Sequence, residues 1–217
     1  MRFWELPAQQ FRLLLCGASK MQTSQNGIDL IKNFESCELR TYKCAAGKNS
    51  IGYGHTKGVV PGMSITYEQA EQFLRDDLTD VERDISRLNL TLSQCQFDAL
   101  ASFVFNLGIG NLLSSTLLKK LQQGDTTGAM RQFTAWIYVT HSVKLNDDRK
   151  VMIREPLRGL CARRMSEQAM FNGEIKLFSF NNQYVNETVI AALHSQIAKT
   201  TDSAIKDYYC EKIRQYS

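Results

Sequence analysis

The chain has 217 residues, of which 43% are hydrophobic and 22% are charged, and its formal net charge at pH 7 is +4. This is the composition of a globular protein, and the length suits one large domain or one domain with an appendage. The 3 Pro and 13 Gly argue against a collagen-like, mucin-like or disordered chain, and so small a charge excess does not mark a nucleic-acid-binding protein.

Residues 1–23 form a leader whose status the sequence leaves open. Its apolar run, residues 11–18, is short and contains an arginine, so it makes a poor signal peptide. No stretch of the chain reaches the roughly 18 consecutive apolar residues of a membrane-spanning helix. Met21 offers a second start directly before the first predicted helix. We therefore expect a weakly structured leader or an over-extended start.

The next part of the chain alternates between helical and strand-like patterns. Residues 24–35 begin with capping residues and place apolar side chains on one helical face. Residues 38–57 lose this period, and their alternation and glycines predict a small β-hairpin sheet. Capping boxes at residues 66–69 and 93–96 open two further helices. The second of these is apolar on almost all sides and is expected to be the buried central helix.

Further helices are predicted at residues 114–124, 127–138 and 160–171. Two segments look like additions to this core. Residues 139–157 are polar and charged without a clear period, which favours a long surface loop. Residues 172–217 are expected to form a helical C-terminal extension, because their apolar residues recur at roughly helical spacing. The central domain is then residues 24–171.

The six cysteines are Cys16, Cys37, Cys44, Cys95, Cys161 and Cys210. None forms a CxxC pair and histidine is scarce, so the sequence does not favour a structural zinc site. Cys95 and Cys161 lie within helical patterns and are expected to be small buried hydrophobic residues.

Glu35 is the first residue that indicates chemistry. It ends the first predicted helix, and a glycine-rich hairpin follows at the distance needed to curl back over it. Glycoside hydrolysis needs a proton donor beside the glycosidic oxygen and an opposite group that activates water or attacks the sugar. Glu35 can be the donor, and Cys44 and Ser50 are the candidates for the opposite wall.

The motifs around these residues resemble the phage-type lysozyme (endolysin, muramidase) family. They lie at residues 26–35, 41–42, 50–56, 96–106, 115–119, 132–136 and 157–164. The resemblance covers about residues 24–171 and keeps the family's order of motifs. It implies an α+β, mainly α, lysozyme-like fold with two lobes: a small N-terminal lobe with a β-hairpin sheet, and a helical C-terminal lobe. The active cleft is expected between the lobes.

The resemblance also implies an activity. Family members hydrolyse the β-1,4 bond between N-acetylmuramic acid and N-acetylglucosamine in bacterial peptidoglycan, which causes cell lysis, and no metal or organic cofactor is expected. Glu35 is then the general acid, and Ser50 keeps a hydroxyl that helps to place water. Cys44 stands where the family has aspartate, and an ordinary thiol, with a pKa near 8.5, is mostly neutral at pH 7.

Six further residues take roles from the same resemblance. Phe105, Asn106 and Arg163 are expected to bind substrate. Arg163 and Arg164 match paired arginines of the family, and we expect one of the two to pair with Glu35 or a neighbouring acid and the other to be solvated. His55 and Asp77 are expected to form a structural ion pair.

The spacing Glu-x-Cys-x6-Cys at Glu35, Cys37 and Cys44 resembles a subset of endolysins with a catalytic cysteine in place of aspartate. In that subset a disulfide holds the catalytic cysteine until a cysteine near the N-terminus exchanges with it, and Cys16 is placed like that residue. The resemblance thus implies a redox switch through Cys37 and Cys44. The alternative is a pair of reduced thiols in the cytoplasm.

The resemblance implies synthesis in the bacterial host cytoplasm and action in the periplasm. We expect a monomer that acts on peptidoglycan and that depends on transient membrane association or a holin.

Two other functions stay open. The first is a cysteine hydrolase of wall peptides that uses Cys44 and His55, but this function gives Glu35 no role. The Asp-to-Cys change can instead have silenced the site, leaving a peptidoglycan-binding or regulatory protein.

Overall fold

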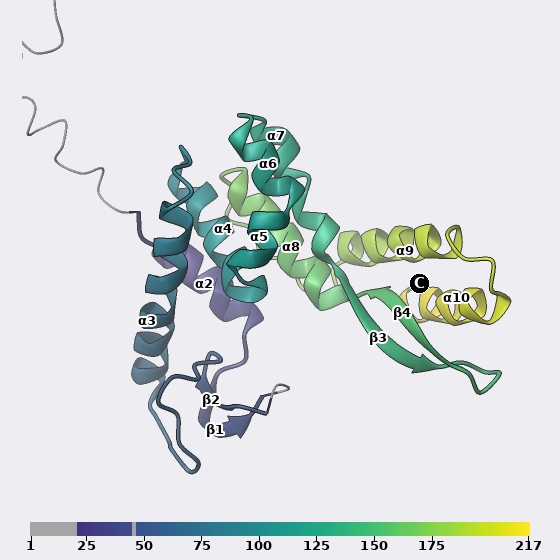
Figure 1. Cartoon of the computed structure of the whole chain (residues 1–217), viewed down its shortest axis with the longest axis horizontal. Coiled ribbons are helices and arrows are strands. Elements are labelled where there is room, and N and C mark those ends of the chain that lie inside the picture. Colours follow the sequence, from purple (N-terminus) through teal and green to yellow (C-terminus); the bar gives the residue numbers. More distant parts are fainter. Residues whose placement is uncertain (1–20, 45–46) are drawn as a thin grey trace, which may run out of the picture.

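A computed structural model describes residues 21–44 and 47–217 of the chain. Most of the predicted leader, including Cys16, lies outside these residues. The fold is mainly helical, with two separate two-stranded antiparallel sheets (Figure 1). It therefore confirms the predicted α+β class. Within the described residues, no helix is both long enough and apolar enough to cross a bilayer.

The first lobe contains a helix, a hairpin sheet and the start of a long helix. Its elements are α2 (Gln25–Phe34), β1 (Glu38–Lys43), β2 (Asn49–Gly52) and α3 (Tyr67–Ser86). β1 pairs with β2 so that Tyr42 lies opposite Ser50, with an irregularity between Glu38 and Tyr42. Apolar side chains from α2, β2 and the first part of α3 pack into one core, which includes Ile28, Ile31, Ile51, Leu74 and Leu78.

The second lobe is a helical bundle around α4. Its elements are α4 (Gln94–Leu107), α5 (Ile109–Ser114), α6 (Thr116–Gln122), α7 (Thr126–Met130), the 3-10 helix η1 (Phe133–Trp136) and α8 (Arg158–Phe171). Every residue from 97 to 104 is buried, so α4 is the central helix that its apolar pattern predicts. Helix α3 joins the lobes, because Leu74 packs in the first core and Ile85 in the second.

The prediction of one helix at residues 127–138 was wrong. This segment contains two short helices, α7 and η1, and a strand begins at Tyr138. The rings of Phe133 and Trp136 both pack edge-on against Phe103, at centroid distances of 5.7 and 5.5 Å. Residues three apart share a face in a 3-10 helix, so the tighter turn lets both rings reach one partner. Helix α5 was not predicted.

The prediction of a surface loop at residues 139–157 was also wrong. This segment is a regular hairpin of β3 (Tyr138–Lys144) and β4 (Lys150–Pro156), paired without interruption from one end to the other. Its inner face carries His141 and Glu155 beside apolar residues such as Ile153. These two polar residues interrupt the alternation of apolar and polar positions that identifies a strand.

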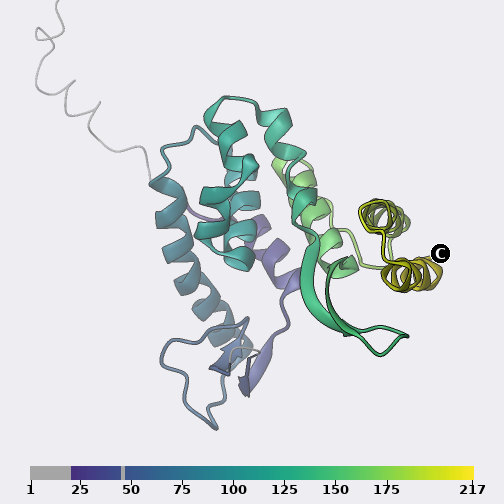
Figure 2. The ribbon, with the colours of Figure 1, turned by 45° about the vertical axis from the view of Figure 1, so that its right-hand side comes forward.

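The last two helices pack against this hairpin. Helices α9 (Gln183–Ile197) and α10 (Ser203–Tyr216) lie together on one side of the helical bundle, next to β3 and β4 (Figures 1 and 2). A third apolar core joins them to the hairpin and to the first half of α8, and includes Ile153, Cys161, Val185, Leu193 and Tyr209. We refer to residues 138–156 together with residues 174–217 as the accessory module.

Glu155 links the two parts of the accessory module. It is buried on β4, where its Oε2 accepts hydrogen bonds from His141 Nε2 (2.8 Å) and from Tyr208 Oη (2.7 Å). Lys212 Nζ lies 3.3 Å from its Oε1. Burial alone raises the pKa of Glu155, but the hydrogen bonds from Tyr208 and His141 and the charge of Lys212 outweigh it and hold the pKa below its ordinary value.

We expect Glu155→Gln to loosen α10. The amide cannot accept the same set of hydrogen bonds from Tyr208 and His141, so the free energy of unfolding should fall by about 2 kcal/mol. Folding lowers the pKa of this carboxyl. The ionised carboxylate therefore adds to the free energy of unfolding above pH 4.5, its ordinary pKa, and this stabilisation is lost as the pH falls through the folded-state pKa. Hydrogen exchange of α10 and thermal unfolding at pH 7 measure the effect. Asp207→Asn, an exposed change on the same helix, is the control, and equal results for the two variants would contradict the role of Glu155.

Candidate active site

Glu35 lies at the junction between the two lobes. It is the residue after α2, where extended backbone angles end the helix and start the path to β1. Its Oε1 accepts a hydrogen bond from Arg163 Nη1 on α8, which lies 128 positions further along the chain. Arg163 is 3% exposed, whereas the Glu35 side chain is 26% exposed. The carboxylate is therefore anchored from the bundle side and reaches solvent on the other.

Arg163 belongs to a buried polar network that connects α4 and α8. Glu167 Oε1 accepts from Ser102 Oγ (2.7 Å) and Arg164 Nη2 (2.9 Å), and Arg163 Nε lies 3.3 Å away. Arg163 Nη2 also donates to the carbonyl oxygen of Ser102 at 3.2 Å. Burial raises the pKa of Glu167, and the two guanidinium groups act in the opposite direction. The network fixes the side chain that holds Glu35.

Ser102 and Glu167 were not predicted from the sequence to belong to the site. The spacing of Arg163, Arg164 and Glu167 on one helical pattern was a usable signal, since residues three and four apart are neighbours on a helix. Ser102 gave no local signal, because only the packing of α4 against α8 brings it to Glu167.

Phe105 and Asn106 lie in the last turn of α4. Asn106 Oδ1 accepts a hydrogen bond from Arg164 Nη2 at 3.0 Å, which joins it to the network that holds Arg163. Phe105 is partly buried and packs against the core of the first lobe. Both residues thus sit on the side of the bundle that faces the first lobe.

Ser50 and Cys44 belong to the small sheet. Ser50 is 1% exposed on β2, and its Oγ has no hydrogen-bond partner among the described residues. Cys44 directly follows β1 and is half-buried. Its backbone N–H donates to the carbonyl oxygen of Lys48 (2.9 Å), and its own carbonyl accepts from the N–H of Gly47 (2.8 Å). The backbone of the hairpin turn therefore holds Cys44 in place.

Cys37 lies at the opposite end of β1 from Cys44. It packs against the core of the first lobe and contacts Tyr53. Burial raises the pKa of Tyr53, and the neighbouring Cys37 thiol adds to the effect. The six residues of β1 lie between the two cysteines. Its ends, Glu38 and Lys43, face Gly52 and Asn49, which are about 10 Å apart at the usual rise of an extended strand.

His55 and Asp77 are in direct contact. Nδ1 of His55 lies 2.9 Å from Asp77 Oδ2, and Nε2 lies 2.8 Å from the carbonyl oxygen of Lys57. The imidazole also stacks on the ring of Phe73, with centroids 4.5 Å apart. Both ring nitrogens therefore face other acceptors, so this geometry does not favour a catalytic dyad of His55 with Cys44.

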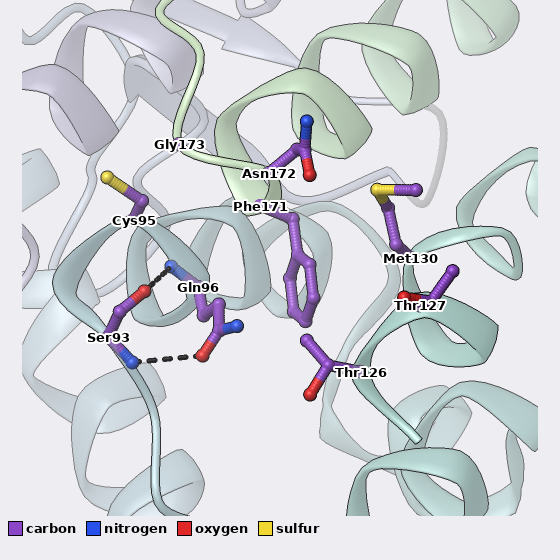
Figure 3. A pocket seen from close by; sticks show the side chains of 9 residues that line it. All are labelled: Ser93, Cys95, Gln96, Thr126, Thr127, Met130, Phe171, Asn172 and Gly173. Carbon is purple, nitrogen blue, oxygen red and sulfur yellow. Dashed lines mark hydrogen bonds between the residues drawn. The ribbon is translucent and has the colours of Figure 1, made fainter. Parts of the chain in front are cut away.

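Two of the other cysteines differ in environment. Cys161 is fully buried, as predicted, and burial raises its pKa to about 12. Cys95 is only half-buried and lines a cavity of about 260 Å³ with Gln96, Thr126 and Phe171 (Figure 3). This cavity lies at the start of α4, whereas Asn106 lies near its end, about 15 Å away along the helix. None of the predicted site residues lines it.

No group of three or more His, Cys, Asp or Glu side chains able to hold a metal ion occurs within residues 21–44 and 47–217. The chemistry that this arrangement supports is acid–base chemistry at Glu35, next to a sheet that carries a thiol and a buried hydroxyl.

The Phage lysozyme family model matches residues 32–167, which is more than half of the chain. An endolysin of Acyrthosiphon pisum secondary endosymbiont phage 1 is 42% identical over 152 residues, covering 70% of this chain and 98% of its own. A SAR-endolysin of bacteriophage PS119 is 37% identical and covers 56% of this chain and 72% of its own. The solved endolysin from Escherichia coli O157:H7 phage FAHEc1 superimposes with a TM-score of 0.55 at 37% identity, covering 70% of this chain and 93% of that chain.

Proposed function

The chain belongs to the phage lysozyme family and is a muramidase that hydrolyses bacterial peptidoglycan, and we propose that Glu35 is its general acid. The observation that carries this proposal is the contact of Glu35 with the buried Arg163. Arg163 binds Oε1, so Oε2 is the oxygen that would carry the acidic proton and pass it to the glycosidic oxygen, which leaves Glu35 as a carboxylate. A fixed carboxyl favours catalysis, because errors of about 1 Å in position can lower a rate about 10²-fold.

We further propose that Cys44 and Ser50 act on the side of the sugar opposite Glu35. The Oγ of Ser50 is buried and without a partner among the described residues, which suits a hydroxyl that binds a catalytic water. Cys44 lies at the start of the hairpin turn and brings a polarisable thiol to the same sheet. Phe105, Asn106 and Arg163 complete the proposed substrate site from the bundle side.

The enzyme class can be tested on purified peptidoglycan in the presence of a reductant. A muramidase releases reducing sugar ends and leaves the peptide cross-links intact. New amino groups without reducing ends would favour the cysteine hydrolase, and binding without any release would favour the silenced site.

Cys44→Asp tests the proposed role of the thiol. The change supplies a carboxylate that is ionised at neutral pH and is a stronger base than a neutral thiol. We expect the rate of peptidoglycan hydrolysis to stay the same or rise, up to about tenfold, and thiol reagents to lose their effect. Cys95→Asp, which alters a half-buried cysteine remote from Glu35, is the matched control. An inactive but folded Cys44→Asp protein would mean that the thiol does something a carboxylate cannot.

We also propose that a Cys37–Cys44 disulfide switches the enzyme off. A disulfide needs a Cα separation of about 4.4–6.8 Å, whereas β1 holds these residues at its two ends. Oxidation therefore requires β1 to leave its pairing with β2. That pairing sets Tyr42 opposite Ser50, so the oxidised form also loses the proposed water site. Cys16, outside the described residues, is our candidate for the thiol that reverses the disulfide by exchange.

Transport to the wall follows from the same proposal. We propose synthesis in the host cytoplasm and action as a monomer in the periplasm, with membrane association or a holin providing passage. The similarity to a protein named as a SAR-endolysin supports a membrane-associated stage. Fractionation of the host before and after lysis tests it, and an enzyme that stays in the cytoplasm throughout would contradict it.

A further inference from the structure

Two segments that are far apart in the sequence form one accessory module. Helices α9 and α10 lie beyond residue 167, where the match to the family ends. They pack on the β3–β4 hairpin, where Tyr208 of α10 binds Glu155 and Tyr209 donates to the carbonyl oxygen of Arg154 at 2.9 Å. The helices therefore cover one face of the hairpin and support its shape.

Beyond the partly buried Tyr138 and the buried Pro156 at one end, the side chains on the other face of the hairpin are exposed among the described residues. The strand register puts Tyr138, Thr140, Ser142, Lys144, Lys150, Met152 and Arg154 on this side, which we call the open face. It carries three cations and no acidic side chain. Lys144 pairs with Asp148 of the turn, but neither Lys150 nor Arg154 has a carboxylate partner among the described residues. Arg154 instead lies over the ring of Tyr138, 4.0 Å from its centroid.

The open face is turned toward the side of the molecule that holds the proposed active site. In both views the two hairpins project from the same end of the bundle, with the end of α2 between them (Figures 1 and 2). Helices α9 and α10 lie on the far side of β3–β4, so the uncovered face looks toward β1–β2. Phe34, the residue before Glu35, also packs against the core of the accessory module.

We propose that the open face is an additional peptidoglycan-binding surface, on which Lys150 and Arg154 bind the carboxylates of the stem peptides. This inference rests on the muramidase function. Stem peptides carry several carboxylates for each disaccharide, and a guanidinium or ammonium group is the natural partner of a carboxylate. The hydroxyls of Thr140 and Ser142 lie between the cations and suit hydrogen bonds to the sugars. The accessory module then sets which walls the enzyme binds, while Glu35 performs the cleavage.

The test measures binding to teichoic-acid-free sacculi by sedimentation. Glu35→Gln is the background, so that the sacculi are not digested during the measurement. Lys150→Glu with Arg154→Glu reverses the two open-face cations, and Lys150→Gln with Arg154→Gln only neutralises them. Lys119→Glu with Lys199→Glu makes the same change of net charge at two exposed lysines on α6 and after α9. Circular dichroism and thermal unfolding verify that all variants fold alike.

We expect the charge reversal at the open face to raise the Kd for sacculi about tenfold at low ionic strength, and neutralisation to raise it about threefold. The effect should shrink at high salt, because exposed charges are screened. Glycan strands stripped of stem peptides by an amidase should show little difference between the variants. A Kd equal to that of the Lys119/Lys199 control would overturn the proposal. An equal loss on stripped strands would overturn the assignment to stem peptides. Failure of the muramidase function is a separate outcome, seen as no reducing ends released by the parent enzyme.

Discussion

Glu35→Gln is expected to lower the rate of peptidoglycan hydrolysis by about 10²–10⁴-fold, the usual contribution of general acid catalysis. Glutamine has the shape of glutamate, and its carbonyl oxygen can still accept from Arg163. It has no acidic proton to give to the leaving oxygen. The loss should therefore appear in kcat, with binding to sacculi largely kept.

The fold of this variant should survive. Replacing a charged acceptor by a neutral one weakens the bond from the buried Arg163, which we expect to lower the free energy of unfolding by about 1 kcal/mol. Glu68→Gln, an exposed change in the first turn of α3, is the control for loss of one carboxylate. Near-full activity of a folded Glu35→Gln protein would show that another group donates the proton.

Oxidation is expected to lower the activity about 10²-fold, and reductant to restore it. The physical reason is that a Cys37–Cys44 disulfide cannot coexist with the pairing of β1 and β2, which spans the distance between the two residues. Removing β1 from the sheet displaces Cys44 and uncovers Ser50, and a displacement of about 1 Å at reacting groups can cost about 10²-fold in rate. Activity of the same preparation before and after reduction measures the change.

Cys37→Ser separates this switch from other effects of oxidation. It keeps the size of the side chain near Tyr53 but cannot form the disulfide, so the variant should be active without reductant. Cys95→Ser is the matched control and should keep the parent's response to oxidation. If Cys37→Ser showed the same dependence on reductant as the parent, the switch would be refuted, and the muramidase function would stand.

The elements that could be predicted from the sequence are those with local signals. Thr66 and Ser93 open α3 and α4 through capping boxes that are complete within four residues, and both boxes form in the structure. The apolar surface of α4 on all sides likewise predicted its central position. The small sheet followed from alternation and glycines between residues 38 and 57.

The parts that could not be predicted depend on contacts between distant segments. The inner face of β3–β4 holds His141 and Glu155 because Tyr208 and Lys212, more than fifty residues later, provide partners for the buried carboxylate. From the local sequence alone, without the contacts that α10 makes, His141 and Glu155 indicate a polar loop. The network that anchors Glu35 also depends on contacts between distant segments, because Ser102 and Glu167 meet only after α4 and α8 pack together.

The spacing of Cys37 and Cys44 shows a different limit. Seven positions are compatible with a turn, which brings two cysteines together, or with a strand, which holds them apart. The structure has a strand there, and its pairing with β2 depends on the first-lobe core that Ile51 and Tyr53 help to form. The spacing alone therefore does not decide whether the two cysteines can pair, and the described fold places them at the two ends of β1.

The most direct test of the central claim is the identity of the sugar at each new reducing end. Purified sacculi are digested by the reduced parent enzyme, the products are reduced with borohydride, and the resulting sugar alcohols are identified by mass spectrometry. A muramidase that uses Glu35 as its acid yields the alcohol of N-acetylmuramic acid, with peptide cross-links intact, and the Glu35→Gln protein yields none. The alcohol of N-acetylglucosamine, or cleaved peptides without any sugar alcohol, would contradict the account.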